Sequence, residues 1–217
     1  MTSIIWDMGG TLVDTYPQVD EVLADTTWPQ GPTASQRAEV ARLRTVSIDH
    51  AVTELAARHG VDVEELRQAY ARLKERWRER PAPLMPGARK VMEAVRAGGG
   101  LNLVATHRDR SSAESLLEGL GVDVDDLVCA PDGLARKPDP AMNRLLLERH
   151  HLDPVSVWCV GDRGIDVEAA LAARCRAFLL DPDGEPAVRE EAGMGAWTRI
   201  TALADLLPRL EEASCAT

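Results

Sequence analysis

Cysteine is scarce in this chain, and its spacing argues against the common cysteine-based sites. The four cysteines are far apart, with no C-x-x-C pair and no cluster with zinc-ligand spacing. Cys129 and Cys159 stand inside apolar, strand-like runs, where cysteine usually behaves as a small buried hydrophobe. This usage is typical of a protein from a reducing compartment.

Long apolar runs are also missing. No stretch approaches the roughly 20 apolar residues of a membrane-spanning helix. The residues before Asp7 carry neither a basic start nor the apolar run of a secretory signal. We therefore expect a soluble, cytoplasmic protein that does not act at a membrane.

Positive charge is in short supply. Lys and Arg total 25 against 35 Asp and Glu, and the formal net charge is −10. A protein that follows a nucleic-acid backbone needs a basic face, so neither DNA nor RNA is expected as the main partner. Lysine occurs only at positions 74, 90 and 137, which makes each lysine a candidate for a specific role.

What the chain does contain is a series of short apolar runs that alternate with helical patterns. Hydrophobic residues make up 45% of the 217 residues, enough for one substantial core domain with an insertion. The alternation predicts βαβ units, a parallel sheet and the α/β fold class. Buried strands are predicted at 3–6, 101–105, 126–130, 156–160 and 176–180, with a sixth near 197–200.

The stretch from residue 16 to residue 83 breaks this alternation. It contains no convincing strand, and its apolar spacing predicts helices, the first of them marked by Val40, Leu43 and Ile48. We therefore expect a helical insertion between the first two strands. The predicted domains are a core formed by 1–15 with 84–217, and a helical domain at 16–83.

Polar and charged residues stand at the carboxyl ends of the predicted strands. Asp7, Thr106 and Asp162 each occupy such a position, and ligands bind at this edge of open α/β sheets. Lys137 precedes a predicted helix, and Asp166 follows Asp162 by about one helical turn. Carboxylates bind hard cations and an ammonium group offsets phosphate charge, so the set suits phosphate chemistry. Asp166 can alternatively stabilise only a helix N-terminus.

The same residues form a series of motifs. Residues 7–14 (DMGGTLVD), Thr106, Lys137 with Pro138, and residues 161–166 (GDRGID) resemble, in order, the motifs of the haloacid dehalogenase superfamily. The resemblance spans the whole chain, and the helical insertion falls where one subgroup carries its cap domain. It implies a Rossmann-like three-layer α/β/α core, a parallel sheet of order 5-4-1-2-3 and a small α-helical cap domain.

The resemblance also implies a role for each motif residue. Asp7 is the expected nucleophile that forms an aspartyl-phosphate, and Thr106 and Lys137 are expected to hold the phosphoryl group. Gly10 and His107 are expected as further substrate contacts. Mg²⁺ is the implied cofactor, with Asp7, the backbone carbonyl of Gly9 and Asp162 as ligands and Asp166 in support.

The implied activity is Mg²⁺-dependent hydrolysis of a small phosphorylated metabolite. The enzyme class is a hydrolase of the phosphatase type, with transfer to another acceptor also open. No oligomeric state and no individual substrate are implied, because substrate selection depends on loops of the cap.

Gly9 departs from the family pattern, in which phosphatases carry a second Asp at this position as general acid and base. Such proton transfer is typically worth about 10²–10⁴-fold in rate. We therefore expect activity that is weak or directed at good leaving groups, such as acyl or aryl phosphates, unless another residue donates the proton. The nearest candidates along the sequence are His107, Asp14, Tyr16 and Asp20.

Two other functions stay open. The loss at Gly9 suits a catalytically impaired relative that binds a ligand or a protein, although retention of the other motif residues argues against it. A phosphonate-cleaving hydrolase needs a lysine in the cap. Lys74 is the lysine within 16–83, and it stands in a charge-rich helix expected to face solvent.

Overall fold

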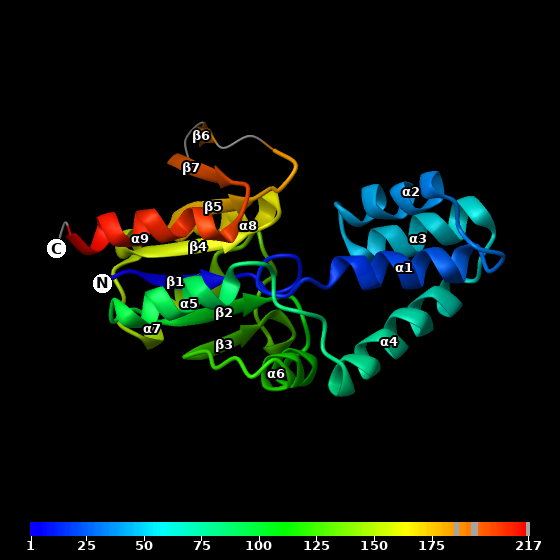
Figure 1. Cartoon of the computed structure of the whole chain (residues 1–217), viewed down its shortest axis with the longest axis horizontal. Helices are drawn as coiled ribbons and strands as arrows, with labels where there is room; N and C mark the ends of the chain where they lie inside the picture. Colours follow the sequence, from blue (N-terminus) through cyan, green and yellow to red (C-terminus); the bar gives the residue numbers. More distant parts are fainter. Residues whose placement is uncertain (185–186, 192–194, 216–217) are drawn as a thin grey trace. The chain divides into compact units, whose positions relative to one another are not determined.

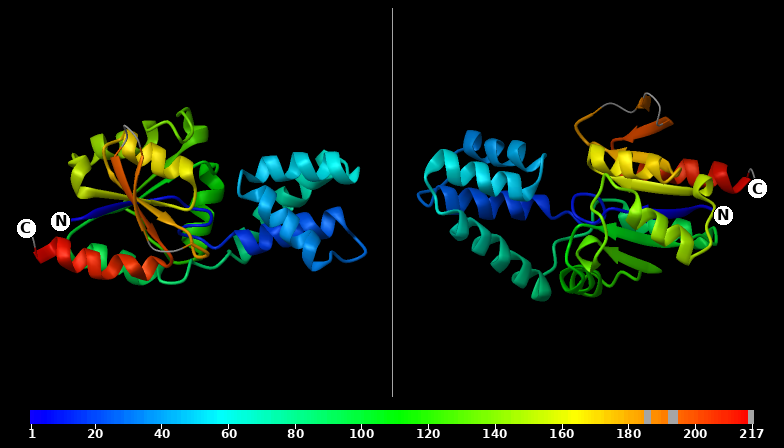
Figure 2. Two further views of the ribbon diagram at one scale, coloured as in Figure 1. Left: turned by 90° about the horizontal axis from the view of Figure 1, so that it is seen from above. Right: turned by 180° about the vertical axis from the view of Figure 1, so that it is seen from behind.

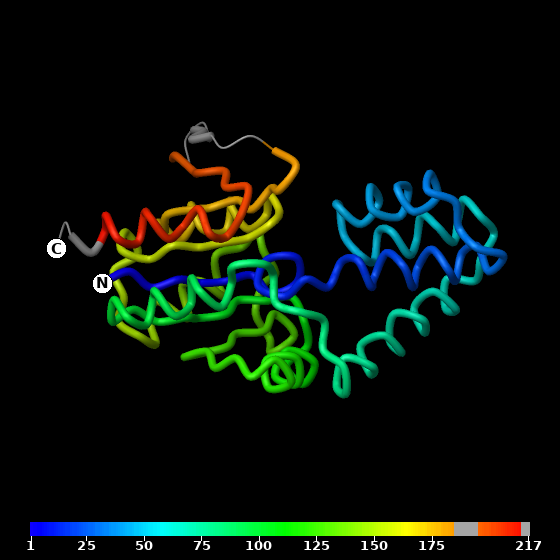
Figure 3. The backbone as a smooth tube through the Cα atoms, in the orientation of Figure 1, coloured from blue at the N-terminus to red at the C-terminus, as the bar shows by residue number. Residues whose placement is uncertain are grey.

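The computed structural model describes residues 1–184, 187–191 and 195–215. The chain divides into two compact units, one formed by Met1–Val13 with Pro83–Thr217 and the other by Asp14–Ala82. We call them the α/β unit and the helical unit. The chain leaves the α/β unit after β1 (Ser3–Trp6) and returns to it before α5 (Ala88–Ala97), as its path shows (Figure 3).

A single twisted sheet forms the centre of the α/β unit (Figure 1). Its strand order is β3-β2-β1-β4-β5-β7-β6, so the predicted order 5-4-1-2-3 is confirmed for the five inner strands. Besides β1, the strands are β2 (Asn102–Thr106), β3 (Asp126–Cys129), β4 (Val157–Gly161), β5 (Arg176–Leu180), β6 (Ala187–Glu191) and β7 (Gly195–Ile200).

The expected parallel sheet is confirmed for its five strands, and the sheet extends beyond them at one edge. Strand β7 extends the parallel part beside β5, but β6 pairs antiparallel with β7. Only residues 192–194 connect β6 to β7. That connection is far shorter than the dozen or so residues of a parallel crossover, so the two strands must run antiparallel.

Helices cover both faces of the sheet, as the three-layer prediction requires (Figure 2). Helices α5 and α9 (Leu206–Cys215) lie together on one face, while α7 (Ala141–Arg149) and α8 (Gly164–Ala172) lie on the other. Helix α6 (Arg110–Gly119) connects β2 to β3. No helix in the described ranges has both the length and the apolar character needed to cross a membrane. Short 3₁₀ turns lie at Ala130–Asp132, Pro154–Ser156 and Leu203–Asp205.

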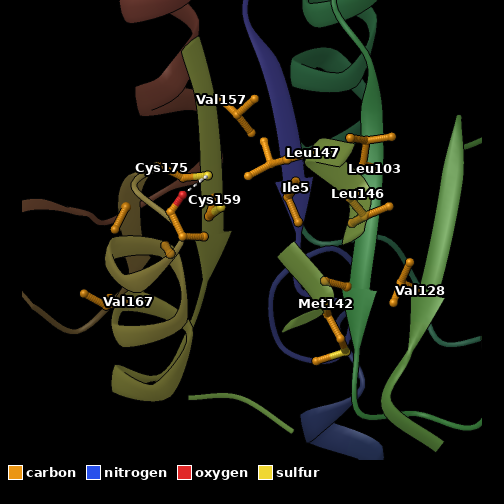
Figure 4. Close-up of a cluster of buried hydrophobic side chains, with 14 of the residues drawn as sticks. Ile5, Leu103, Val128, Met142, Leu146, Leu147, Val157, Cys159, Val167 and Cys175 are labelled. Atoms are coloured by element: carbon orange, nitrogen blue, oxygen red, sulfur yellow. Dashed lines mark hydrogen bonds between the residues drawn. The ribbon is translucent and has the colours of Figure 1, made fainter. Parts of the chain in front are cut away.

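Successive side chains of each strand point to opposite faces of the sheet, so they pack into two cores, one on each face. Ile5, Leu103 and Cys159 join the apolar cluster that packs against α7 and α8 (Figure 4). Trp6 occupies the next position on β1 and is fully buried; its indole Nε1 donates to Oδ1 of Asn102 at 3.1 Å. The two cores hold the strands rigidly side by side, and so align their carboxyl ends at one edge.

The regular structure of the helical unit consists of helices. They are α1 (Tyr16–Thr27), α2 (Ala34–Arg44), α3 (Ile48–His59) and α4 (Val63–Glu79). The prediction that Ile48 belongs to the same helix as Val40 and Leu43 is wrong. Ser47 caps a new helix instead, because its hydroxyl accepts a hydrogen bond from the backbone N–H of His50 at 2.9 Å.

Candidate active site

Asp7 lies directly beyond β1 at the carboxyl edge of the sheet. Its backbone N–H donates to the carbonyl of Val160 on β4 at 2.8 Å, which fixes it beside the neighbouring strand. The chain then turns tightly, with Gly10 at a φ of 91°, a conformation that favours glycine. The N–H groups of Leu12 and Val13 both donate to the carbonyl of Met8, which closes the loop. The Asp7 side chain is only 5% exposed.

Lys137 connects Asp7 to Asp166. Its Nζ lies 2.7 Å from Oδ1 of Asp7 and 2.7 Å from Oδ1 of Asp166. All three side chains are buried, with 4, 5 and 7% exposure for Lys137, Asp7 and Asp166. Lys137 thus joins Asp7, 130 positions away in the chain, to Asp166, 29 positions away.

Asp166 stands in the first turn of α8, where its two oxygens have different partners. Oδ1 accepts from Lys137, and Oδ2 accepts from the backbone N–H of Arg163 at 3.1 Å. A Cβ at Gly161 would lie 2.2 Å from the Cβ of Asp166, so only glycine at that position allows the carboxylate to pack there. Asp166 therefore both caps the helix start and orients Lys137.

Thr11 contacts the other carboxylate of the predicted set. Its hydroxyl donates to Oδ1 of Asp162 at 2.9 Å, and Thr11 itself is fully buried. Thr11 stands within the first motif, but no role is predicted for it from the sequence. Its place in that motif is the one sign in the sequence that Thr11 belongs to the site. The contact with Asp162 depends on the fold, which brings together residues 151 positions apart.

Thr106 and His107 lie at the end of β2. Thr106 is the last residue of the strand and is 3% exposed; its hydroxyl accepts from the backbone N–H of Arg108 at 3.2 Å. In the part of the chain that the structure describes, this hydroxyl makes no hydrogen bond to Asp7 or Lys137. His107 does reach the lysine segment: its Nε2 accepts from the backbone N–H of Lys137 at 2.8 Å.

Negative charge exceeds positive charge at the buried centre. Burial, together with the charges of Asp166 and Asp162, raises the pKa of Asp7 to about 7 against the opposing effect of Lys137. Burial works to lower the pKa of Lys137, but Asp166 and Asp7 outweigh it and hold the pKa above its usual value. The buried ammonium of Lys137 thus lies between two buried carboxylates, those of Asp7 and Asp166.

These residues fit a magnesium site of the kind that uses few protein ligands. No group of three or more His, Cys, Asp or Glu side chains within the described ranges is arranged to hold a metal ion. Mg²⁺ typically keeps several waters and takes one or two carboxylates together with substrate phosphate. Asp7, Asp162 and the carbonyl of Gly9 supply oxygen atoms of the kind that Mg²⁺ binds. The buried carboxylates of Asp7 and Asp166 share one ammonium, which favours a further cation beside them.

The comparisons with known proteins decide the family. The model of haloacid dehalogenase-like hydrolases matches residues 4–180, which is most of the chain. The chain belongs to this family. The resemblance carried by the four motifs is thereby confirmed, and this haloacid dehalogenase-like chain is an enzyme of the hydrolase class.

Curated relatives agree with this assignment, and a solved structure shares the fold. A phosphoglycolate phosphatase of Rhodospirillum rubrum is 30% identical over 182 residues, 79% of this chain and 76% of that protein. An N-acetylmuramic acid 6-phosphate phosphatase of Pseudomonas aeruginosa is 27% identical over 202 residues, covering 86% and 87%. The structure of a haloacid dehalogenase family hydrolase of Deinococcus radiodurans, with bound phosphate and sodium, has a TM-score of 0.78 at 20% identity, covering 98% and 96%.

The other candidate proton donors lie in the helical unit. Arg44 binds both oxygens of Asp20, at 2.6 Å and 2.9 Å, and its guanidinium lies 3.8 Å from the centre of the Tyr16 ring. Burial raises the pKa of Asp14, which the charge of Arg44 partly offsets. Lys74, the lysine required for phosphonate cleavage, lies with its ammonium 5.5 Å from the centre of the Tyr70 ring on the same helix.

Proposed function

We propose that this protein is a Mg²⁺-dependent phosphatase that hydrolyses a small phosphorylated metabolite through an aspartyl-phosphate on Asp7. The observation that carries the proposal is the buried contact of Asp7 with Lys137, which Asp166 holds from the other side at the same distance of 2.7 Å. The relatives from Rhodospirillum rubrum and Pseudomonas aeruginosa, both named as phosphatases of phosphorylated small molecules, support it.

Asp7 supplies the nucleophile in this proposal. One of its oxygens attacks phosphorus while the bond from phosphorus to the leaving oxygen breaks, and water then hydrolyses the acyl phosphate to regenerate Asp7. Lys137 offsets charge on the carboxylate and on the phosphoryl oxygens. Thr106 supplies a hydroxyl at the end of β2 that can donate to a phosphoryl oxygen. Gly10 shapes the turn after Asp7, where its backbone N–H donates to the carbonyl of Val13 at 2.9 Å.

The metal would be held by Asp7, Asp162 and the carbonyl of Gly9. When bound, Mg²⁺ neutralises charge on the nucleophile and on the phosphoryl group. Thr11 orients Asp162 through the 2.9 Å hydrogen bond. Asp166 acts in support, since both of its oxygens accept hydrogen bonds from protein groups.

The substrate preference follows from Gly9. No side chain at position 9 can protonate the leaving oxygen, so leaving groups of low pKa are favoured over alkoxides. Acyl and aryl phosphates are accordingly the preferred substrates, and alkyl phosphates react slowly. The helical unit is proposed to act as the cap domain that selects among them.

The test is hydrolysis of 4-nitrophenyl phosphate by the wild-type protein and by Asp7→Asn. We expect turnover with Mg²⁺, loss of turnover with EDTA, and a decrease of about 10³-fold or more in Asp7→Asn, since the nucleophile is removed. Asp183→Asn is the matched control, because Asp183 is an exposed carboxylate in the turn after β5. Turnover that survives in Asp7→Asn would exclude Asp7 as the nucleophile. No turnover on a broad panel of phosphates would favour a binding protein.

A further inference from the structure

The His107 imidazole contacts the segment that carries Lys137 through the backbone of that segment. Its Nε2 lies 2.8 Å from the backbone nitrogen of Lys137. A backbone N–H can only donate, so Nε2 must accept the hydrogen bond through its lone pair. The ring is then neutral and carries its proton on Nδ1.

The charges around His107 favour the same neutral state. Burial, together with the nearby charges of Lys137, Arg163 and Arg136, lowers the pKa of His107 to about 4, against an opposing effect of Asp166. Those three cations belong to two other loops at this edge of the sheet. A protonated imidazole would be repelled by all three cations. Its Nε2 could also no longer accept the hydrogen bond from the backbone N–H of Lys137.

The segment held in this way has little regular structure of its own. Lys137 lies in a turn between the 3₁₀ turn at Ala130–Asp132 and helix α7. Asp139 N–H donates to the carbonyl of Arg136 at 3.0 Å across the turn. The hydrogen bond to His107 joins the backbone of Lys137 itself to the end of strand β2.

We propose that His107 is a positioning residue: its neutral imidazole fixes the backbone of Lys137 and thereby places the ammonium between Asp7 and Asp166. The two 2.7 Å contacts of Nζ require this placement, and displacement of the backbone by about 1 Å would weaken both. His107 consequently acts through Lys137 and does not replace the proton donor absent at Gly9. The kinetic part of the test rests on the proposed phosphatase function; the spectroscopic part does not.

The kinetic test uses His107→Leu, His107→Gln and His107→Asn with 4-nitrophenyl phosphate and Mg²⁺. The Gln side-chain amide reaches the position of Nε2, whereas the Asn amide reaches only that of Nδ1. We expect kcat to fall about tenfold in His107→Leu, the rate equivalent of one hydrogen bond, with KM nearly unchanged. His107→Gln should recover most of the loss and His107→Asn should not. Recovery by Asn alone, or a change confined to KM, would identify a substrate contact and overturn the proposal.

The spectroscopic test needs no substrate. The chain has lysine only at 74, 90 and 137, so ¹⁵N-labelled lysine gives few side-chain signals, and Lys137→Met identifies that of Lys137. A buried, hydrogen-bonded ammonium exchanges its protons slowly, which distinguishes Lys137 from the more exposed Lys74 and Lys90. We expect this protection to be lost in His107→Leu and kept in His107→Gln. An unchanged Lys137 signal in folded His107→Leu would refute the proposal even if no phosphatase activity were found.

The tautomer is measured on the wild-type protein itself. With ¹⁵N-labelled histidine, the His107 ring should give the shifts of an Nδ1-protonated neutral imidazole throughout pH 5.5–8, since its pKa is about 4. His107→Gln assigns the signal. His50→Gln on α3 is the matched control and should leave kinetics and the Lys137 signal unchanged. A protonated or Nε2-protonated His107 ring would contradict the hydrogen bond on which the proposal depends.

Discussion

Position 9 is a glycine, and the lack of a side chain there affects the proposed chemistry more than any other single residue. Gly9 is not among the glycines with positive φ, so an Asp there is compatible with the backbone. Gly9→Asp should raise kcat/KM for an alkyl phosphate about 10- to 100-fold, because a general acid then protonates the alkoxide leaving group. The rate with 4-nitrophenyl phosphate should change much less. Steady-state kinetics on the two substrates measure the difference.

Gly9→Asn is the control for this prediction, since it adds the same bulk without an acid. If the alkyl phosphate is turned over no faster by a correctly folded Gly9→Asp protein, the missing proton donor is not what limits the reaction. Equal gains in the Asp and Asn variants would attribute the effect to loop conformation.

Gly161 is the second residue whose lack of a side chain matters. An alanine Cβ would lie 2.2 Å from the Cβ and 2.4 Å from the Cγ of Asp166, a distance that forces the carboxylate to move. Because Asp166 holds Lys137, Gly161→Ala should lower kcat by about 10- to 100-fold. Gly164→Ala is a close control: nothing lies within 4 Å of its added Cβ, and it should retain activity. Equal activity in the two variants would show that the position of Asp166 is not critical.

The residues of the site were predictable only in part from the sequence. Asp7, Asp162 and Lys137 stand out by motif and by their places after strands or before a helix. The partners of Thr11 and His107 could not be read in the same way. The Thr11 contact joins positions 151 apart, and that of His107 depends on the course of a turn that has no periodic pattern.

Strand β1 is the element on which the site is built, because Asp7 follows it directly. Trp6 ties this strand to β2: its indole donates to Asn102, whose side-chain amide in turn donates to the carbonyl of Met92 at 3.0 Å. Trp6→Phe removes the indole N–H, so the buried Oδ1 of Asn102 loses its hydrogen-bond donor. We expect a loss of about 2–4 kcal/mol in the free energy of unfolding, from the unpaired acceptor and from the cavity.

Urea denaturation of the Trp6→Phe variant measures this loss. Trp28→Phe in the helical unit is the control, since Trp28 is partly exposed and meets His59 edge-on at 4.7 Å. It should cost less than about 1 kcal/mol. A cost for Trp6→Phe no larger than that of the control would mean that the hydrogen bond to Asn102 adds nothing to the junction of β1 and β2.

Elements were predictable where the apolar pattern is strong. Strands β1 and β5 lie where their runs of SIIW and RAFLL place them, because buried parallel strands read as continuous apolar segments. Strand β6 was not predicted. Its sequence AVREE is mostly polar, and its pairing as the antiparallel edge beside β7 depends on a hairpin, which an apolar run does not signal.

For the whole molecule, the order of strands explains why distant residues meet. Strand β1 lies between β2 and β4, so Asp7, Thr106 and Asp162 arrive at one edge from three neighbouring strands. Lys137 lies in the connection between β3 and β4. This connection passes over β2 and β1, because these two strands lie between β3 and β4 in the sheet. The sequence predicts the strands themselves, but their order was implied only by the family resemblance.

The free energy of unfolding depends on pH through groups whose pKa differs between the folded and unfolded chain. His107 has a pKa of about 4 when folded against an ordinary 6.5, so between these values only the unfolded chain binds a proton there. Its contribution to stability is therefore complete above pH 6.5 and is lost as the pH falls toward 4. The raised pKa of Asp7 has the opposite sign over much of the same range.

Comparing the wild type with His107→Gln isolates the His107 contribution, because Asp7 is common to both proteins. From pH 7 to pH 4 the wild type should lose about 1–2 kcal/mol relative to the variant, a size that allows for solvent screening of a half-buried ring. Urea denaturation at constant ionic strength measures the difference, with His50→Gln as the control. The contrary outcome is a free energy of unfolding that changes equally with pH in the wild type and in His107→Gln. It would show that the folded protein binds a proton at His107 as readily as the unfolded chain does. The hydrogen bond from the backbone N–H of Lys137 excludes this.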